Sequence, residues 1–491
     1  MRKRIILLAI VPALLACSAF LDEKPQADIT RQATQTSEEE SAYVAASEAE
    51  ASLKGAYALF KADIYEACQF YLGDCMTDNC YIGGDGIAEE QFDNIALTAT
   101  NKQVDVMWSQ YYDILGAATN VIENVKLMDD NMILPEDRVA ITAEARFIRA
   151  WVLFDIVRLW GAAPMTLELI PSITVENLDR WYPVMYPERT SEEKIYDQIL
   201  VDLDDTEVIA NLESKSVGAF KATKGAAYGL KAMVYATRGA KSGRPYDKVV
   251  EYCDKVIAEG YSLVPNFEDL WTVAGKFSSE SIFELYFSNE AEQHNWAYWI
   301  LLTEVSGSVK VTWRRYCTPT QDLLAKFDKA KDSRYASSIY WGKVPYDTYY
   351  PANNYPLAYK IRQKESDIIL LRLADVLLLK AEALVELGQP KDAVKIVNDI
   401  RDRAGVAPLD ENMSQDAARL AVENERQLEL LLEGKRWFDL VRNDRFEEVM
   451  KLAHDKNGNL RFTDIPTWRR LLPVPQGQID INERLTQNEG Y

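Results

Sequence analysis

Apolar residues recur at helical spacing through much of this chain. Residues 136–160 show the pattern most clearly, because one face of a helix with 3.6 residues per turn collects their large apolar side chains. These are Phe147, Ala150, Trp151, Phe154 and Val157. Gly161 then ends the pattern, as a helix stop signal does. The same spacing predicts helices over residues 41–61, 101–128, 188–203, 223–238 and 246–258.

Two segments predict pairs of closely packed helices. In residues 370–403, three small residues are separated by seven and then five positions. They are Ala381, Gly388 and Ala393. This spacing is similar to that of the small positions in the 34-residue tetratricopeptide repeat, and Ala232 and Gly239 repeat the gap of seven. The sequence therefore predicts a mainly α fold with a tetratricopeptide-like helical-repeat scaffold; a plain helical bundle is the alternative.

Two stretches break the helical pattern. Residues 65–100 contain four glycines among scattered polar groups. Residues 260–369 are rich in aromatic, β-branched and proline residues, with a short strand predicted over residues 281–287. Binding residues often lie on loops that a rigid scaffold holds in place. We therefore expect the irregular, loop-rich ligand-binding parts within these two stretches.

The first residues are organised like an exported lipoprotein. A basic cluster precedes an uncharged apolar run over residues 5–16, which is shorter than the roughly 20 residues of a membrane-spanning helix and fits a secretory signal. The run ends directly before Cys17, as in a bacterial lipobox, and two or more acyl chains on Cys17 would anchor the protein stably. The expected parts are a signal peptide over residues 1–16, an anchor and tether over 17–40, and a single domain over 41–491.

Net charge and amino-acid composition limit which classes of partner the protein can bind. The 491-residue chain carries a net charge of −21, and loss of the three basic leader residues changes this to −24. Because such a surface repels phosphate backbones, we expect no nucleic-acid binding. The 11 Trp, 26 Tyr and 15 Phe favour a surface that stacks on a ligand.

The cysteines do not predict a metal site. Cys68, Cys75 and Cys80 form a cluster without C-x-x-C spacing and without a neighbouring histidine. In an exported chain a disulfide within this cluster remains open. Cys253 is expected as a buried thiol on a helix, and we expect neither metal nor cofactor.

Short motifs occur in order along nearly the whole mature chain. They are FLD at residues 20–22, EARFIRAW at 144–151, RLWG at 158–161, KGAAY at 224–228, ESIFE at 280–284, LRLADV at 371–376, NDIRDRAG at 398–405, ERQLEL at 425–430, EGKRWFDLVR at 433–442, LPVP at 472–475 and QNEGY at 487–491. In this order they resemble the SusD/RagB family of outer-membrane nutrient-binding lipoproteins.

The resemblance implies tetratricopeptide-like helices that cradle a less regular ligand-binding part. It also implies three partners: a SusC-like TonB-dependent transporter, a glycan ligand, and outer-membrane lipid reached through acylated Cys17. In this family, early acidic residues such as Asp22 and Glu23 go with export to the cell exterior. Members mostly bind glycans and some serve peptide uptake, and the motifs above do not separate these substrates.

Two glutamates could be read either as a catalytic pair or as members of structural ion pairs. Glu425 and Glu429 could be pictured as two carboxylates flanking a glycosidic bond. Acids and bases three residues apart can also pair on one helix, which keeps the acids ionised and unfit for acid catalysis. Such pairs are Arg426 with Glu429, Glu433 with Arg436, and Asp439 with Arg442. Since neither His294 nor His454 lies in a catalytic motif, we expect a binding protein and not an enzyme.

Aromatic residues with polar neighbours form the predicted ligand platform. Sugar rings stack on aromatic faces, while their hydroxyls pair with Asn, Asp and Arg. The predicted ligand-binding residues, the first three by resemblance to the family, are Asp78, Asn79, Tyr81, Asn295, Trp296, Trp299, Trp313, Arg314 and Tyr316. The alternative is that these aromatics fill the core. A second aromatic group, at residues 340–341 and 346–355, is a weaker candidate that could face the transporter.

The leading hypothesis is a cell-surface lipoprotein that captures oligosaccharide or polysaccharide and delivers it to a TonB-dependent transporter. A peptide-capturing member of the same family is the alternative. An all-helical glycoside hydrolase is the third hypothesis.

Overall fold

The computed structural model describes residues 40–83, 86–215, 220–288, 290, 295, 297, 304–305, 309–310, 317–344 and 349–491. The predicted signal peptide, Cys17 and almost the whole tether lie outside these residues. No helix in the described ranges is long and apolar enough to cross a membrane.

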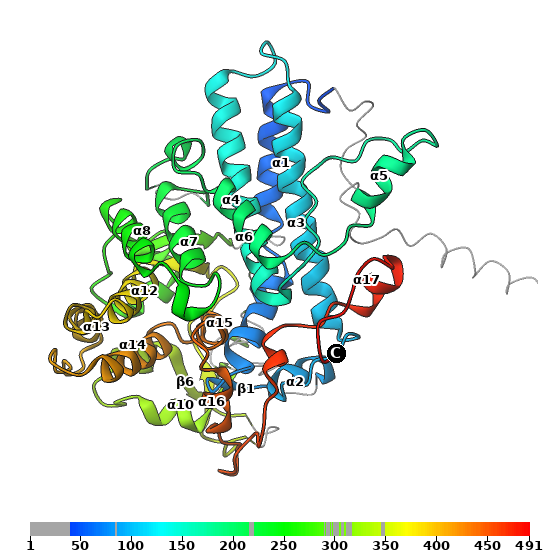
Figure 1. The fold of residues 1–491 in the computed structure, drawn as a ribbon. Coiled ribbons are helices and arrows are strands. Elements are labelled where there is room, and N and C mark those ends of the chain that lie inside the picture. The colour runs from blue at the N-terminus through cyan, green and yellow to red at the C-terminus, as the bar shows by residue number, and fades with distance from the viewer. Residues whose placement is uncertain are drawn as a thin grey trace, which may run out of the picture.

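Long helices stand together as a bundle on one side of the molecule (Figure 1). They are α1 (Ala46–Ala58), α3 (Lys102–Leu127), α4 (Pro135–Trp160) and α6 (Glu192–Asp202). The helices predicted over residues 101–128 and 136–160 are confirmed to within one residue at each end.

Local signals and core packing both fix this bundle. The Asn101 side chain accepts hydrogen bonds from two backbone amides of the first turn of α3, at 2.8 and 3.2 Å. Gly161, with φ at +68°, ends α4. In the core the rings of Trp108 and Trp160 meet edge to face at 5.1 Å, an arrangement that aromatic quadrupoles favour.

Helical hairpins pack beside the bundle (Figure 1). They are formed by α7 (Lys224–Tyr235) with α8 (Tyr246–Ala258), and by α12 (Leu373–Glu386) with α13 (Pro390–Ala404), followed by α14 (Gln415–Glu429). Helix α12 packs against α8, α13 and α14. The small residues Ala232, Ala381 and Ala393 are fully buried, as close helix packing requires, and Gly388 turns the chain at φ +74°. The predicted tetratricopeptide-like scaffold is confirmed.

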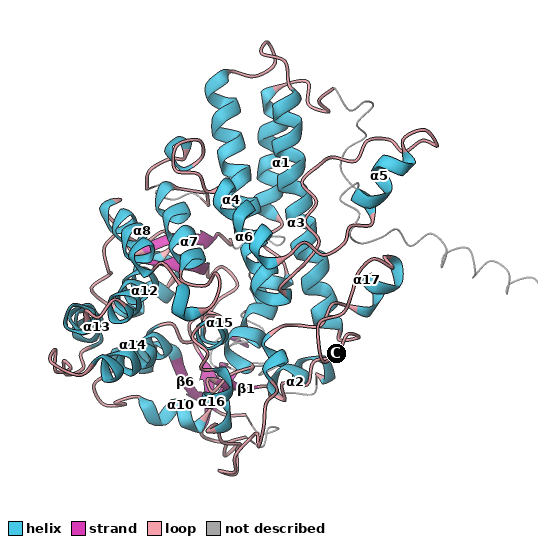
Figure 2. Cartoon of the chain, in the orientation of Figure 1, coloured by secondary structure: helices cyan, strands magenta, loops and turns pink. Residues whose placement is uncertain are grey.

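Several predicted boundaries were wrong. The helices predicted from residues 41 and 188 begin only at Ala46 and Glu192. The hairpin predicted from residue 370 begins later, because residues 368–372 form strand β8 (Ile368–Arg372), which pairs antiparallel with β2 (Ser281–Leu285) (Figure 2). Every residue of β8 is buried, and a continuous apolar run of this kind cannot be told from a buried helix by its period. The strand predicted over residues 281–287 is confirmed for 281–285.

Shorter elements complete the described part of the chain. The remaining strand pairs are β1 (Cys80–Tyr81) with β5 (Thr318–Pro319), β3 (Glu304–Val305) with β4 (Val309–Lys310), and β6 (Ile339–Gly342) with β7 (Tyr355–Ala358). The short helical elements near them are η2 (Ile64–Cys68), η3 (Tyr71–Cys75), α2 (Ile87–Asp93), α10 (Gln321–Lys326), α11 (Ser333–Ser338), α15 (Arg436–Arg442) and α16 (Phe446–Lys451). Two further helices, α5 (Leu178–Met185) and α17 (Gln476–Ile481), project on the side away from the hairpins (Figure 1).

The described cysteines are buried free thiols. Cys253 is fully buried on α8, as predicted. The Cys68 sulfur lies 3.8 Å from a Gln103 side-chain oxygen. The disulfide left open within the cluster of Cys68, Cys75 and Cys80 is not formed.

A buried ionic network joins the hairpins to the irregular segment. Glu429, at the end of α14, accepts hydrogen bonds from Arg372 at 2.6 Å and from Arg334 at 3.2 Å, and it also pairs with Arg403. Arg372 pairs in turn with Glu433 at 2.8 Å. Burial opposes ionisation, but the guanidinium groups of Arg403, Arg372 and Arg334 hold the pKa of Glu429 well below its usual range.

Of the three ion pairs predicted between near neighbours, one forms. In α15 a guanidinium nitrogen of Arg442 lies 2.7 Å from a carboxylate oxygen of Asp439. The other two predictions were wrong, since Glu429 and Glu433 take partners from distant segments. The chain leaves α14 after Glu429 and enters α15 only at Arg436. Helical spacing therefore does not apply between Glu433 and Arg436.

We predict that Glu429→Gln is strongly destabilising. It leaves buried guanidinium groups without their shared negative charge, so the free energy of unfolding should fall by about 3–5 kcal/mol. Chemical denaturation of the soluble protein, residues 18–491, measures this change. The exposed Glu136→Gln is the matched control, with an expected change within about 0.5 kcal/mol. Equal stability of the two variants would contradict the role given to Glu429.

Candidate ligand-binding surface

The two irregular stretches meet at strands β1 and β5. Tyr81 in β1 lies opposite Thr318 in β5, and the predicted site residue Tyr316 is two positions before Thr318 in the chain. The Thr318 hydroxyl is 3.0 Å from the hydroxyl of Tyr355 in β7. The fold therefore brings the early loop (residues 78–81), β5 and the β6–β7 pair into one region (lower part of Figure 1).

Tyrosine rings gather around this junction. The ring of Tyr81 stacks on that of Tyr349, with centroids 4.9 Å apart and planes 20° from parallel. The Tyr350 ring lies 5.6 Å from Tyr355, and its hydroxyl donates to the Pro319 carbonyl at 2.7 Å. Tyr349 and Tyr350 are half-buried, whereas Tyr81 and Tyr355 lie deeper. We call these four residues the tyrosine surface.

Polar groups from the C-terminal part border the tyrosine surface. The Tyr81 hydroxyl donates to the His454 carbonyl at 3.0 Å, and the His454 ring nitrogen Nδ1 lies 3.1 Å from an Asp322 carboxylate oxygen. The Lys456 ammonium is 5.2 Å from the Tyr349 ring centroid. Flat rings next to cationic and hydroxyl groups match the chemistry of a polyhydroxylated ligand.

The predicted site residues Asp78 and Asn79 are buried behind this surface. The Asp78 carboxylate accepts hydrogen bonds from Arg436 at 2.8 and 3.1 Å and from Gln427 at 2.9 Å. Burial works against ionisation, but the Arg436 guanidinium holds the pKa of Asp78 well below its usual range. Asn79 donates to Asp74 at 2.9 Å and accepts from Gln427 at 2.8 Å. In this structure both side chains fix the loop that carries Tyr81, and neither faces solvent.

Asp74 completes the attachment of the early loop. Its carboxylate accepts hydrogen bonds from the backbone amides of Leu432 at 3.0 Å and Gly434 at 3.1 Å. Burial raises the pKa of Asp74 to about 6. The contact is so close that a Cβ at Gly73 would lie 2.3 Å from the Gly434 Cα. Sequence analysis missed these partners, because nothing in a local pattern connects the early loop to the turn after α14.

Asn295 lies at a different attachment point. Its backbone amide donates to the Lys364 carbonyl at 2.6 Å, and its side-chain amide donates to the Ser366 carbonyl at 2.7 Å. It is fully buried. The predicted residues Trp296, Trp299, Trp313, Arg314 and Tyr316, and also His294, lie outside the described residues.

A pair of buried carboxyl groups sits next to this attachment point. Asp367 accepts hydrogen bonds from the Phe287 amide and from Lys276, both at 2.8 Å. Glu284 accepts from the Phe277 amide at 2.6 Å and from the Ser281 hydroxyl at 2.5 Å. Burial and then the Asp367 charge raise the pKa of Glu284 to about 8. The pair therefore joins the end of β2 to residues 364–367, the segment whose carbonyl groups bind Asn295.

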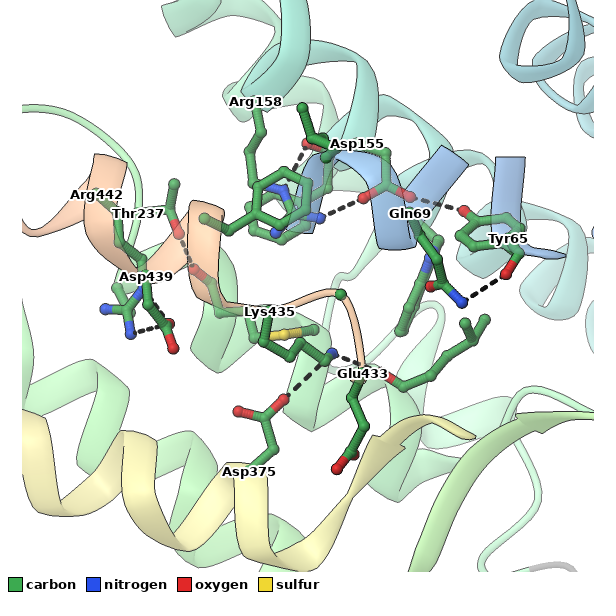
Figure 3. A pocket seen from close by; sticks show the side chains of 18 of the residues that line it. Tyr65, Gln69, Asp155, Arg158, Thr237, Asp375, Glu433, Lys435, Asp439 and Arg442 are labelled. Carbon is green, nitrogen blue, oxygen red and sulfur yellow. Dashed lines mark hydrogen bonds and ion pairs between the residues drawn. The ribbon is translucent and has the colours of Figure 1, made fainter. Parts of the chain in front are cut away.

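A cavity lined by apolar and charged side chains lies in the scaffold, between α3, α4, α7 and α15 (Figure 3). Its volume of ≈ 70 Å³ is room for about two water molecules at ≈ 30 Å³ each, whereas ligand pockets usually exceed about 300 Å³. Polar groups in its lining pair with one another. Lys435 lies 3.2 Å from Asp375, and the Tyr65 hydroxyl donates a hydrogen bond to Asp155 at 2.6 Å. This volume suits a few water molecules, and we do not assign the ligand to this cavity.

A helical-repeat scaffold that presents an aromatic surface defines the class of the protein, and comparison with known proteins agrees. The sequence profile described as "Starch-binding associating with outer membrane" matches residues 19–236, and the profile described as "SusD family" matches residues 330–491. SusD-like protein P2 of Formosa agariphila is 27% identical over 92% of this chain and 94% of its own length.

Solved structures show the same fold. A laminarin binding SusD-like protein superposes with a TM-score of 0.74 at 21% identity, covering 91% of this chain and all of that chain. Surface glycan-binding protein A from Bacteroides thetaiotaomicron, in complex with laminarihexaose, superposes with a TM-score of 0.75 at 18% identity, covering 90% of this chain and 99% of that chain. The chain belongs to the SusD family, whose members are binding proteins associated with the outer membrane.

We predict that Glu284 makes stability fall as pH rises. Its pKa of about 8 in the folded protein exceeds the ordinary value of 4.5, so the folded state holds a proton that the unfolded state releases. The stabilisation is complete below the unfolded-state pKa of 4.5 and is lost as pH rises through the folded-state pKa of about 8. Between these two values the free energy of unfolding falls by up to about 1.4 kcal/mol per pH unit.

The variant Glu284→Gln, which stays neutral, should therefore gain stability relative to the unchanged protein between pH 5 and pH 8. Denaturation curves at several pH values measure this difference. The exposed Glu50→Gln is the control. A difference between Glu284→Gln and the unchanged protein that stays constant with pH would refute the assignment.

Proposed function

We propose that this protein is a lipid-anchored lipoprotein of the outer membrane, facing the cell exterior. It captures a glycan and delivers it to a SusC-like TonB-dependent transporter without breaking it down. The observation that carries the proposal is the stacked pair of Tyr81 and Tyr349, held at the junction of the two irregular stretches. The anchor would be the acylated Cys17, and the names of the structural relatives support a glycan as the ligand.

The proposed contacts combine stacking with hydrogen bonding. Tyr349 and Tyr350 offer half-buried ring faces, and Lys456 lies within reach of sugar hydroxyls beside them. Trp313, Arg314 and Tyr316 precede β5 directly in the chain, so they would extend this surface. Trp296 and Trp299 follow Asn295 and would add a second group of rings.

The buried acids support binding without catalysis. The carboxylates of Asp78 and Glu429 are enclosed by guanidinium groups that keep them ionised. An acid catalyst needs a proton to donate, so neither suits that role. In the proposal, Asp78 and Asn79 act as positioning residues that set the place of Tyr81.

A thermal-shift screen of residues 18–491 tests the proposed function. The ligands are laminarin, starch, other polysaccharides and pools of peptides. A ligand that binds only the folded state adds RT ln(1 + [L]/Kd), about 2.7 kcal/mol at a hundredfold excess over Kd. We expect a shift with one class of glycan and no new reducing ends. A shift with peptides alone would move the function to peptide capture, and released sugar would indicate a hydrolase.

We predict that Tyr349→Ala and Trp313→Ala each raise the Kd for that glycan at least about tenfold, equivalent to about 1.4 kcal/mol, because each removes a stacking face. The melting temperature should not change. Isothermal titration measures the Kd. Tyr349→Phe keeps the ring and should keep most of the affinity, and Tyr182→Ala alters an exposed ring on α5 and should change nothing. Normal binding by both alanine variants would place the ligand elsewhere.

A further inference from the structure

Three buried thiols lie together behind the tyrosine surface. Cys75 ends η3, Cys80 begins β1, and Cys317 immediately precedes β5. None of them is more than 2% exposed. The sulfur atoms of Cys75 and Cys317 are 3.5 Å apart, and Cys80 also contacts Cys75.

The cysteines that are close in sequence are not all close in space. Cys68, the nearest cysteine before Cys75, points toward Gln103 and takes no part. Cys317, which is 242 positions from Cys75, is its direct neighbour. These two sulfurs, already in contact, must approach by about 1.5 Å to reach the ≈ 2.05 Å of a disulfide bond.

We propose that Cys75 and Cys317 form a disulfide in the exported protein. The inference rests on the proposed function only through export to an oxidising compartment. The two thiols together lose two protons and two electrons as the S–S bond forms. A disulfide-bearing thiol oxidant, such as oxidised glutathione or an oxidoreductase, accepts them and becomes two thiols.

The bond has to form before the core closes. The thiolate is the species that attacks a disulfide, and burial raises the pKa of all three thiols, that of Cys80 to about 12. Once folded, the cluster is also out of reach of an oxidant. Protein folded under reducing conditions therefore stays reduced, and protein folded under oxidising conditions carries the bond.

The disulfide would tie the scaffold to the ligand-binding surface. Cys75 lies in the segment that Asp74 fixes to the turn after α14, and Cys317 adjoins the strand that pairs with Tyr81. A covalent link at this point fixes β5 relative to the helices.

Alkylation of denatured protein tests the inference. Residues 18–491 are unfolded and then refolded, either with mixed reduced and oxidised glutathione or with dithiothreitol. The protein is next denatured in iodoacetamide, and mass spectrometry counts the alkylated thiols. Five cysteines are present besides Cys17, so we expect three labels after oxidative refolding and five after refolding with dithiothreitol. Peptide mapping should find Cys75 linked to Cys317.

Variants make the result specific. Cys68→Ser should keep the link and show two labels after oxidative refolding, whereas Cys317→Ser should show four. Five labels on the unchanged protein, or a link between Cys75 and Cys80, would overturn the inference. The same mass measurement can be made without refolding, on protein taken from the membranes of the producing cells and denatured in iodoacetamide. It shows whether the Cys75–Cys317 disulfide is present in the protein as the cell makes it. Because neither measurement involves a glycan, failure here and failure of the proposed function are separate results.

Discussion

The buried ion pairs around the turn between α14 and α15 hold the rest of the structure in place. Glu429 and Glu433 bind Arg372 of β8, and Arg436 binds Asp78 of the early loop. Unpaired charges at these depths would cost several kcal/mol each. The helical hairpins, the β2–β8 pair and the loop that carries Tyr81 are therefore locked to one turn, and none of them can shift without breaking a pair.

This arrangement explains how residues far apart in the chain form one surface. Tyr81 comes from the early stretch and Tyr349 from the late one, and their stacking depends on both stretches being fixed to the same scaffold. The cavity between the scaffold helices has a volume of ≈ 70 Å³, below the roughly 300 Å³ of an ordinary ligand pocket. The proposal therefore assigns glycan capture to the tyrosine surface.

The sequence predicted the scaffold well, because long helices and hairpins leave a strong 3.6-residue period. The period predicts α3 and α4 to within one residue at each end. It wrongly extends a helix over residues 370–372, the last three of β8, because this apolar run has no period that separates strand from helix. The partners of Glu429 and the stacking of Tyr81 on Tyr349 are tertiary contacts, which no local pattern contains. Asp78 and Asn79 show a related limit: the resemblance to the family placed them in the ligand platform, but the fold turns both side chains inward.

Hydrogen–deuterium exchange with and without the tightest-binding glycan tests the central claim most directly. The account predicts slower exchange at residues 78–82, 317–320 and 349–356, where the tyrosine surface and the strands beside it lie. It predicts unchanged exchange in the hairpin of α7 and α8. Protection confined to that hairpin, or to the long-helix bundle, would contradict the assignment of ligand capture to the tyrosine surface.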